Sequence, residues 1–241
     1  MKPTPLNRRT FIKIGSTTVA SFLIGCPEMG RAKRLSTGGS TDQRAQSVAP
    51  ENAASSTEQN AISTATTECA PTSDDITGPY WRKGIPVRSE FDLYGHSGQK
   101  LTLSGSVRTE HCEPIANAVI EMWHATPTVA PANALSRADS VDYDMSSPKF
   151  RYYGQFATDA QGTYAMSTMK PGWYLNGAAF RPSHIHVRIY VDGVERLTTQ
   201  LYFEGDPFIG ADPWASAAPE RAIALQSAED GSLTGSFDFT V

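Results

Sequence analysis

Two histidines separated by one residue are the clearest chemical signal in the sequence. His184 and His186 begin segment 184–191, which is rich in β-branched residues and therefore predicts a strand. Side chains two positions apart on a strand point to the same face, and their Cα atoms lie about 6.5–7 Å apart. One metal ion can bridge that gap, so the pair predicts a metal site. Two surface or structural histidines would give the same pattern.

The other metal ligands have to come from elsewhere in the chain. A zinc site needs a third His, a carboxylate or a Cys, yet no further His lies nearby and no Cys follows Cys112. Tyr174 does lie nearby, in a loop that leads to the histidines. Phenolate is a hard anionic donor, and a trivalent iron lowers the pKa of a bound phenol far below its usual value of about 10. Tyr174 is therefore a candidate ligand, although a packed loop aromatic is the commoner fate of a tyrosine.

The segments that must position these residues predict an all-β fold. Strand-like runs occupy 101–107, 118–123, 150–158, 163–168, 184–191, 196–203 and 237–241. Turn signals at 159–162 and at Asp192-Gly193 separate neighbouring runs. Only 220–226 resembles a helix. We expect a β-sandwich of mixed or antiparallel strands with long loops and one short helix, preceded by a disordered linker.

Composition limits the classes of function. All but two of the Phe, Trp and Tyr residues lie in 80–241, the exceptions being Phe11 and Phe22. A domain of that length can bury a substantial core. The formal net charge of −4 argues against nucleic-acid binding, which needs a basic face. No apolar run reaches the roughly 18–20 residues that span a bilayer.

The N-terminus predicts export. Arg8 and Arg9 precede a moderately apolar stretch, 14–25, which is typical of a twin-arginine signal peptide. Cys26 follows it in a lipobox-like context, so we expect a signal peptide over 1–25 and a lipid on Cys26. The protein would then be periplasmic or a membrane-anchored lipoprotein on the extracytoplasmic side. Cleavage without a lipid and a buried N-terminal helix are the alternatives.

A tether is expected between this signal and the domain. Residues 27–75 contain no Phe, Trp or Tyr and consist mostly of small and polar residues. Such a segment buries too little apolar area to offset its ordering entropy. We therefore predict a flexible linker over 26–75 and a folded β-sandwich domain over 76–241. In an oxidising compartment Cys69 and Cys112 are expected to form a disulfide, the alternative being two free thiols.

Several short motifs then occur together in one order. They are TGPY at 77–80, NAVIEMWH at 117–124, PGWY at 171–174, RPSHIH at 181–186 and TQLYFEGDP at 199–207. Jointly they resemble the intradiol ring-cleavage dioxygenases, and most closely the protocatechuate 3,4-dioxygenase branch. The resemblance covers about residues 70–241 and implies an oxidoreductase that inserts both atoms of O2.

The resemblance implies a mononuclear non-haem Fe(III) held by two tyrosines and two histidines. Tyr174, His184 and His186 match the pattern directly. The first tyrosine ligand is assigned to Tyr143, because it is the first tyrosine in the sequence after the strand-end tryptophan, Trp123. Tyr152 and Tyr153 are its rivals, but they lie in the following strand-like run.

Further roles follow from the same resemblance. Arg181 would stabilise negative charge beside the ring, and Gln200 would hydrogen-bond near the oxygen site; a surface salt bridge and a solvent-facing strand residue are their alternatives. Tyr174 would also serve as a base. The pocket wall is expected to include Gly78, Pro79, Tyr80 and Trp173, although Trp173 could equally belong to the core. The implied reaction cleaves a catechol-type ring between its hydroxylated carbons and yields a cis,cis-muconate.

Two other classes of function stay open at this point. One is an exported transthyretin-like β-sandwich binding module without catalysis, and the other is a zinc or copper enzyme that uses His184 and His186. The substrate is also open. A carboxylated catechol would need a cation, for which Arg137 and Arg151 are candidates only by sequence proximity. The expected partners are a small aromatic diol and O2, with no nucleic acid and a membrane only through Cys26. Whether a second copy of the chain binds as a homo-oligomer stays open.

Overall fold

The computed structural model describes residues 68–91, 95–145 and 150–241. These belong to one compact unit, Ala61–Val241. The signal peptide predicted for 1–25, the lipid on Cys26 and the linker up to residue 67 are therefore outside the described residues. Within the described part no helix has the length and apolar character needed to cross a bilayer.

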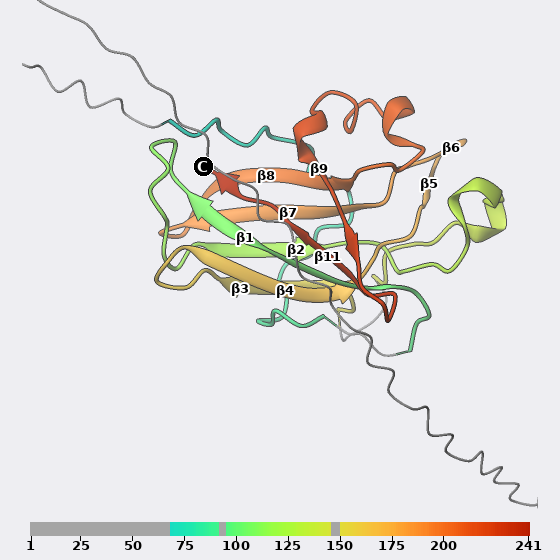
Figure 1. Ribbon diagram of the computed structural model, residues 1–241, viewed down its shortest axis with the longest axis horizontal. Helices are drawn as coiled ribbons and strands as arrows, with labels where there is room; N and C mark the ends of the chain where they lie inside the picture. The colour runs from blue at the N-terminus through green and yellow to red at the C-terminus, as the bar shows by residue number, and fades with distance from the viewer. Residues whose placement is uncertain (1–67, 92–94, 146–149) are drawn as a thin grey trace, which may run out of the picture. The chain divides into compact units, whose positions relative to one another are not determined.

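Two five-stranded sheets form the domain (Figure 1). In the first, β1 pairs in parallel with β11 and β12 and antiparallel with β4, while β10 extends β11. In the second, the order is β3-β2-β7-β8-β9, and only the β8–β9 pair is parallel. The bounds of the first sheet are β1 Lys100–Arg108, β4 Thr163–Met169, β10 Gln226–Ser227, β11 Leu233–Ser236 and β12 Phe239–Thr240. Those of the second are β2 Val119–Trp123, β3 Tyr153–Ala157, β7 His184–Val191, β8 Val194–Phe203 and β9 Ala222–Ile223.

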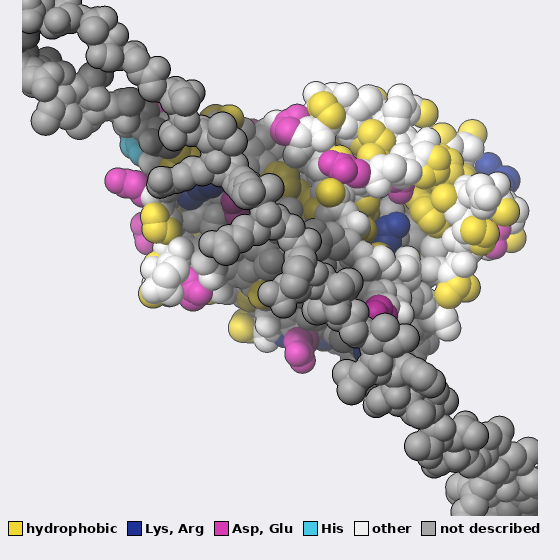
Figure 2. Space-filling view, viewed as in Figure 1, with side chains coloured by type: hydrophobic (Ala, Val, Ile, Leu, Met, Phe, Trp, Pro, Cys, Tyr) yellow, Lys and Arg dark blue, Asp and Glu magenta, His cyan; other side chains and the backbone are white. Residues whose placement is uncertain are grey.

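Short elements complete the chain. A two-stranded ribbon pairs β5, Leu175–Asn176, with β6, Ala179–Phe180. Single 3-10 turns occur at η1 Ala132–Ala134, η2 Arg137–Asp139, η3 Ile209–Ala211 and η4 Pro219–Arg221. On the face of the molecule shown in Figure 2, hydrophobic side chains gather over η1, β5 and β6.

The main core lies between the two sheets. Leu101, Leu103 and Val107 of β1 are fully buried and belong to one apolar cluster with Ile185 and Val187 of β7. Each set consists of alternate residues of its strand, which is the pattern of one sheet face. The predicted all-β sandwich is therefore confirmed, and the same alternation turns His184 and His186 away from this core.

The turn between β7 and β8 also follows the sequence prediction. Val191 pairs with Val194, so Asp192 and Gly193 alone connect the strands, with φ of 52° and 76°. Positive φ at both central residues is the requirement of a type I′ hairpin, which an Asp-Gly pair meets at low cost. The turn sets the register of the first two pairs, and a one-residue shift between Ile189 and Tyr190 then brings His184 opposite Tyr202 and His186 opposite Gln200.

The prediction of a helix over 220–226 is wrong. Only Pro219–Arg221 forms a 3-10 turn, with the proline at its start, and Ala222–Ile223 then pairs in parallel with Tyr202 and Phe203. Burial decides the conformation here because the Arg221 side chain is almost fully enclosed and bonded to Asp75. A solvent-facing helix would leave both charges unpaired.

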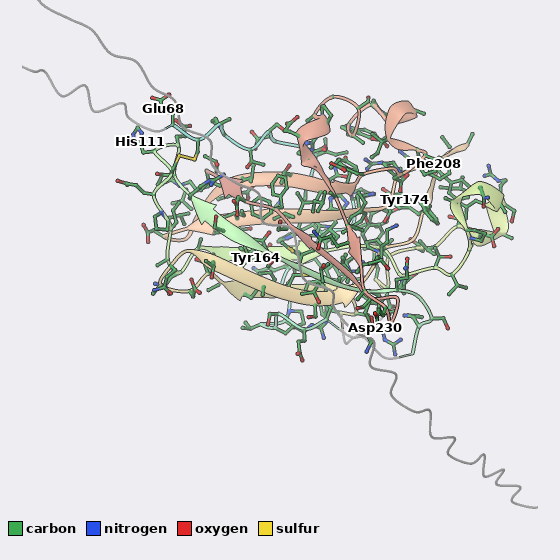
Figure 3. The ribbon with its side chains drawn as sticks, in the orientation of Figure 1. Glu68, His111, Tyr164, Tyr174, Phe208 and Asp230 are labelled. Atoms are coloured by element: carbon green, nitrogen blue, oxygen red, sulfur yellow. A yellow bond between two sulfur atoms is a disulfide. The ribbon has the colours of Figure 1, made fainter. Side chains whose placement is uncertain are left out.

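A disulfide joins Cys69 to Cys112, as expected from the cysteine content. From it the chain runs along the β8 edge toward the start of β7: Asp75 N donates to Thr198 O at 2.8 Å, and the Thr199 hydroxyl donates to Ser73 O at 2.8 Å. Figure 3 shows the disulfide, beside Glu68 and His111, at the opposite end of the sheets from Tyr174. The segment 69–80 thus runs from the end of the sheets that carries the disulfide toward the end that carries Tyr174.

The buried His124 predicts a pH dependence of stability. Its Nδ1–H donates to Ala125 O at 2.7 Å, its Nε2 accepts from the Thr168 hydroxyl at 2.8 Å, and burial lowers its pKa to about 4. The unfolded chain binds a proton below about pH 6.5, so this stability is complete above pH 6.5 and is lost as pH falls toward 4.

Chemical denaturation between pH 4 and 7 tests this expectation. His124→Gln should reduce the slope of unfolding free energy against pH by up to about 1.4 kcal/mol per pH unit. The exposed His111 supplies a control, His111→Gln, whose slope should match the wild type. Equal slopes for both variants would show that His124 does not carry the effect.

Candidate active site

Four side chains from three parts of the chain meet on the outer face of the second sheet. Tyr143 comes from the β2–β3 loop, Tyr174 from the segment after β4, and His184 and His186 from β7. The Tyr143 hydroxyl lies 3.3 Å from His184 Nε2. Ring centroids are 5.5 Å apart for Tyr143 and Tyr174, 5.6 Å for Tyr174 and His184, and 4.9 Å for the two histidines. All four are at least nine-tenths buried.

The structure separates Tyr143 from its two rivals. The Tyr152 hydroxyl lies 2.6 Å from His96 Nδ1, and its ring packs in the main core. The Tyr153 hydroxyl donates to Tyr80 O at 2.8 Å. Of the three, only Tyr143 directs its oxygen at a histidine of β7. The geometry therefore favours Tyr143 as the partner of Tyr174.

The two imidazoles present nitrogen atoms suited to a metal. His184 Nδ1–H donates to Pro182 O at 2.6 Å, which leaves the Nε2 lone pair directed toward Tyr143. A carbonyl partner on one ring nitrogen commonly fixes the tautomer of a metal-binding His. Neither nitrogen of the buried His186 makes a hydrogen bond of good geometry with a described residue, and the nearby Ile76 backbone only partly opposes the lowering of the His186 pKa. A buried unpartnered imidazole is costly unless something binds it.

Electrostatics at the site favour a bound cation. Burial, aided by the positive charge of Arg181, lowers the pKa of His184 to about 3. Burial, followed by the charge of His184, holds the pKa of His186 well below its usual value. Both imidazoles are therefore neutral, which is the form that binds metals. Burial raises the pKa of Tyr143 and of Tyr174, and Arg181 opposes both shifts. A metal cation would reverse the balance by stabilising the phenolates.

The donor set is not that of a common zinc site. Over the described ranges, His, Cys, Asp and Glu form no group of three or more that could hold a metal ion. The convergent donors are two phenols and two imidazoles instead. Hard oxygen donors together with imidazoles fit ferric iron, so the residues present fit the metal that the sequence motifs imply.

Aromatic rings and one glycine enclose this centre. Tyr80 stacks on Tyr143 with centroids 4.0 Å apart and meets Tyr174 edge-on at 5.7 Å. Trp123 stacks flat on His186 at 5.0 Å, as expected for cross-strand neighbours in β2 and β7. Gly78 has a φ of +69°, and a Cβ there would lie 3.1 Å from His186 Cε1. Gly78 and Tyr80 thus cover the centre, whereas Pro79 between them is exposed.

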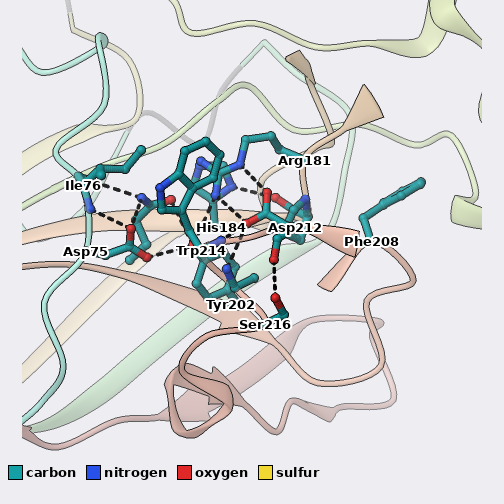
Figure 4. A network of polar contacts seen from close by, with 12 residues as sticks. Asp75, Ile76, Arg181, His184, Tyr202, Phe208, Asp212, Trp214 and Ser216 are labelled. Atoms are coloured by element: carbon teal, nitrogen blue, oxygen red, sulfur yellow. Dashed lines mark hydrogen bonds and ion pairs between the residues drawn. The ribbon is translucent and has the colours of Figure 1, made fainter. Parts of the chain in front are cut away.

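Arg181 is held in a buried ion pair rather than on the surface. Its Nε and Nη2 donate to the two Asp212 oxygens at 2.7 and 3.1 Å, and each side chain is only 4% exposed. Burial opposes ionisation of Asp212, but hydrogen bonds from Arg181 and the Ala215 and Trp214 amides hold its pKa below the usual value. Nη2 also donates to the Tyr202 hydroxyl at 3.2 Å, and the Trp214 ring covers the guanidinium at 4.6 Å (Figure 4). The surface salt-bridge alternative for Arg181 is wrong.

Gln200 takes part in a second buried network that joins the first. Its amide donates to Asp75 Oδ1 at 3.1 Å and to Ile76 O at 3.0 Å. The Tyr202 hydroxyl donates to Asp75 Oδ2 at 3.0 Å and accepts from Arg181, and Arg221 pairs with the same carboxylate. Gln200 is fully buried, so the solvent-facing alternative is wrong. Its contacts hold the segment that leads to Gly78 and Tyr80.

The sequence interpretation missed four members of these networks. Tyr202 could have been found, because it lies two residues after Gln200 on one strand and so shares its face. The other three, Asp75, Asp212 and Arg221, lie in loops or turns where no periodicity marks them. Asp75 and Arg221 are 146 positions apart in sequence.

Two further expectations about the pocket are not supported by the geometry. Trp173 Nε1 donates to Asp206 at 2.6 Å and its ring meets Phe208 edge-on, so its contacts differ from those of Tyr174. Arg137 is exposed and donates to Gly177 O at 3.4 Å. Arg151 lies 3.9 Å from Asp144. Neither of these two contacts involves one of the four central residues, so neither contact marks its arginine as the cation for a substrate carboxylate.

Comparison with known proteins agrees with this site. A family model described as dioxygenase matches residues 76–241, which is more than half of the chain. The chain belongs to the intradiol ring-cleavage dioxygenase family. It is 32% identical to a chlorocatechol 1,2-dioxygenase of Pseudomonas sp. strain P51 over 69% of this chain and 68% of that protein. It is 30% identical to a protocatechuate 3,4-dioxygenase beta chain of Burkholderia cepacia over 72% of each.

Solved structures lead to the same family. The dioxygenase domain of a carbohydrate-binding fusion protein from Streptomyces sp. SirexAA-E is 31% identical, with a TM-score of 0.60, over 71% of this chain and 98% of that one. A 3-chlorocatechol 1,2-dioxygenase from Rhodococcus opacus 1CP is 28% identical, with a TM-score of 0.59, over 70% and 71%. This dioxygenase is thus a ring-cleaving oxidoreductase of the catechol type. The relatives include both the catechol and the protocatechuate branches.

Proposed function

We propose that this dioxygenase binds one non-haem Fe(III) and uses O2 to cleave a catechol-type ring between its two hydroxylated carbons, giving a cis,cis-muconate-type product. The observation that carries the proposal is the convergence of Tyr143, Tyr174, His184 and His186, with both nitrogens of a buried imidazole unpartnered. Tyr143, Tyr174, His184 and His186 would hold the iron. A transthyretin-like binding module would not need that arrangement of donors.

The bound iron would supply a Lewis-acidic, redox-active centre that lets a catecholate react with O2. Tyr174 Oη would accept a proton from a substrate hydroxyl, since the nearby Arg181 guanidinium favours charge on that oxygen. Arg181 would also stabilise negative charge that develops on the substrate ring. The two hydrogen bonds to Asp212 keep the guanidinium oriented. Tyr80 and Trp123 would exclude water from the face that they cover, which strengthens these interactions.

The purified, iron-loaded protein provides the test. It should be wine-red from tyrosinate-to-iron charge transfer and should hold one iron per chain. With O2 it should cleave at least one of catechol, protocatechuate and hydroxyquinol, measured as O2 uptake matched by muconate absorbance. Tyr174→Phe should bleach or shift the colour and reduce turnover, because it removes one phenolate and the proposed base.

Two results would contradict the proposal. A colourless protein with stoichiometric zinc would favour the zinc-enzyme alternative instead. An unchanged spectrum and unchanged cleavage in Tyr174→Phe would remove Tyr174 from the site. The same substrate screen decides between the catechol and protocatechuate branches, because only a protocatechuate-type substrate carries a carboxylate that needs a cation in the pocket.

We also propose that the protein is exported by the twin-arginine route and tethered through a lipid on Cys26. The support is the paired Arg8 and Arg9 before an apolar stretch, and the lipobox-like context of the cysteine. Cell fractionation should find the wild type in the membrane fraction and Cys26→Ala in the soluble periplasmic fraction. Identical fractionation of the two would exclude the lipid.

A further inference from the structure

A pocket outside the proposed iron site contains a lysine that forms no ion pair with any described residue. Its volume is about 390 Å³. Its walls come from 98–99, from 128–131 before η1, and from Lys170, Pro171 and Trp173. None of the four central site residues lines it. Figure 2 shows that the surface near η1 is rich in hydrophobic side chains.

The lysine has no acceptor of its own. Lys170 Nζ lies 5.7 Å from the Trp173 ring centroid and 5.5 Å from that of Phe203, and the Lys170 side chain donates no hydrogen bond to any described residue. Burial lowers the pKa of Lys170, which the charge of Asp206 opposes. The Asp206 carboxylate is engaged elsewhere: it accepts from Trp173 Nε1 at 2.6 Å, and from the backbone amides of Ser183 and Phe208 at 2.9 and 3.0 Å.

The other walls are mainly apolar. Val129 is 74% exposed, and Pro131, Pro171 and Trp173 add apolar side chains to the lining. A partly desolvated ammonium gains most from an anion that replaces its lost water. Flat apolar walls favour a ligand whose body is planar and apolar.

We propose that this pocket binds a small carboxylate with a flat apolar body, of the benzoate type, with its carboxylate on Lys170 Nζ and its body between Trp173 and the 128–131 segment. The site is separate from the ring-cleavage centre, and the inference does not depend on the iron. The pocket is nevertheless connected to that centre by the chain. Trp173 directly precedes Tyr174, and the Ser183 hydroxyl, next to His184, donates to Pro171 O at 2.7 Å.

Calorimetric titration of the full-length, iron-loaded protein with benzoate tests the proposal. Lys170→Met should weaken benzoate binding by about ten- to a hundredfold, the range expected for a charge-assisted hydrogen bond. Lys170→Arg should keep most of the affinity because the charge remains. Lys83→Met, on an exposed lysine outside the pocket, is the matched control and should bind as the wild type does.

Two further ligands test the roles of the carboxylate and of the flat body separately. Benzyl alcohol lacks the charge and acetate lacks the flat body, so each should bind the wild type more weakly than benzoate. Thermal unfolding of each variant checks that the fold is intact. The proposal is overturned if wild type does not bind benzoate, if Lys170→Met binds it as Lys83→Met does, if Lys170→Arg loses as much affinity as Lys170→Met, or if acetate binds as tightly as benzoate.

Discussion

Tyr143→Phe is expected to abolish stable iron binding in this dioxygenase. The Tyr143 hydroxyl lies 3.3 Å from His184 Nε2 at the centre of the four donors, and the substitution removes only that oxygen. Loss of a residue that merely orients a metal ligand commonly costs about 10- to 100-fold in metal affinity, and loss of an anionic ligand should cost more. Ring-cleavage activity should fall with the iron content. Metal analysis and the visible spectrum of the purified variant provide the measurement.

Two neighbouring tyrosines give matched controls for this substitution. Tyr152→Phe removes a hydroxyl bonded to His96, and Tyr153→Phe removes one that donates to Tyr80 O. Each changes the protein by the same single oxygen, so each should keep its iron. Tyr153→Phe should shift the spectrum slightly, because its partner Tyr80 stacks on Tyr143. Iron retained by Tyr143→Phe but lost by Tyr153→Phe would transfer the ligand role to Tyr153.

Arg181→Met is expected to cause the largest loss of stability among the site variants. It leaves the Asp212 carboxylate, whose side chain is 4% exposed, without its ion-pair partner. Breaking a buried ion pair from one side typically costs about 3–5 kcal/mol. Turnover should fall about 10- to 100-fold as well, since Arg181 favours charge on the Tyr174 oxygen. Denaturant unfolding and steady-state kinetics measure the two effects separately.

Two companion variants show whether Arg181 acts on Tyr174 or only supports the fold. The double variant Arg181→Met with Asp212→Asn should regain part of the stability, because no buried charge is then left unpaired. It should not regain turnover. Arg181→Lys keeps a cation and should preserve the pH profile of turnover better than Arg181→Met does. If the double variant recovers both stability and turnover, the role of Arg181 is structural alone.

The buried network around Tyr202 explains how distant segments form one site. Asp75 accepts from Gln200, Tyr202 and Arg221, while Tyr202 also contacts Arg181 (Figure 4). These bonds fasten the segment after the Cys69–Cys112 disulfide to β8. That segment then places Gly78 against His186 and Tyr80 against Tyr143. The position of the site's cover thus depends on contacts made on the same outer face of β7 and β8 that carries the two histidines.

Local pattern was sufficient for the strands and for the histidine pair. β-branched runs, turn residues and period-two alternation depend on neighbours in the chain, so the sequence by itself determined β7, its hairpin and the common face of His184 and His186. The expected helix at 220–226 failed because a tertiary contact, the Arg221–Asp75 pair, overrides local propensity there.

Only the tertiary structure decided the rest. Loops have no periodicity, so nothing local tells that the Tyr143 hydroxyl lies at His184 or that the Trp173 indole donates to Asp206. The pairing of Asp75 with Arg221 joins residues 146 positions apart, and it exists only because burial makes an unpaired charge costly. Residue types and their spacing along a strand are fixed by the chain, whereas the partners of loop side chains are fixed by what the folded sheets bring within reach.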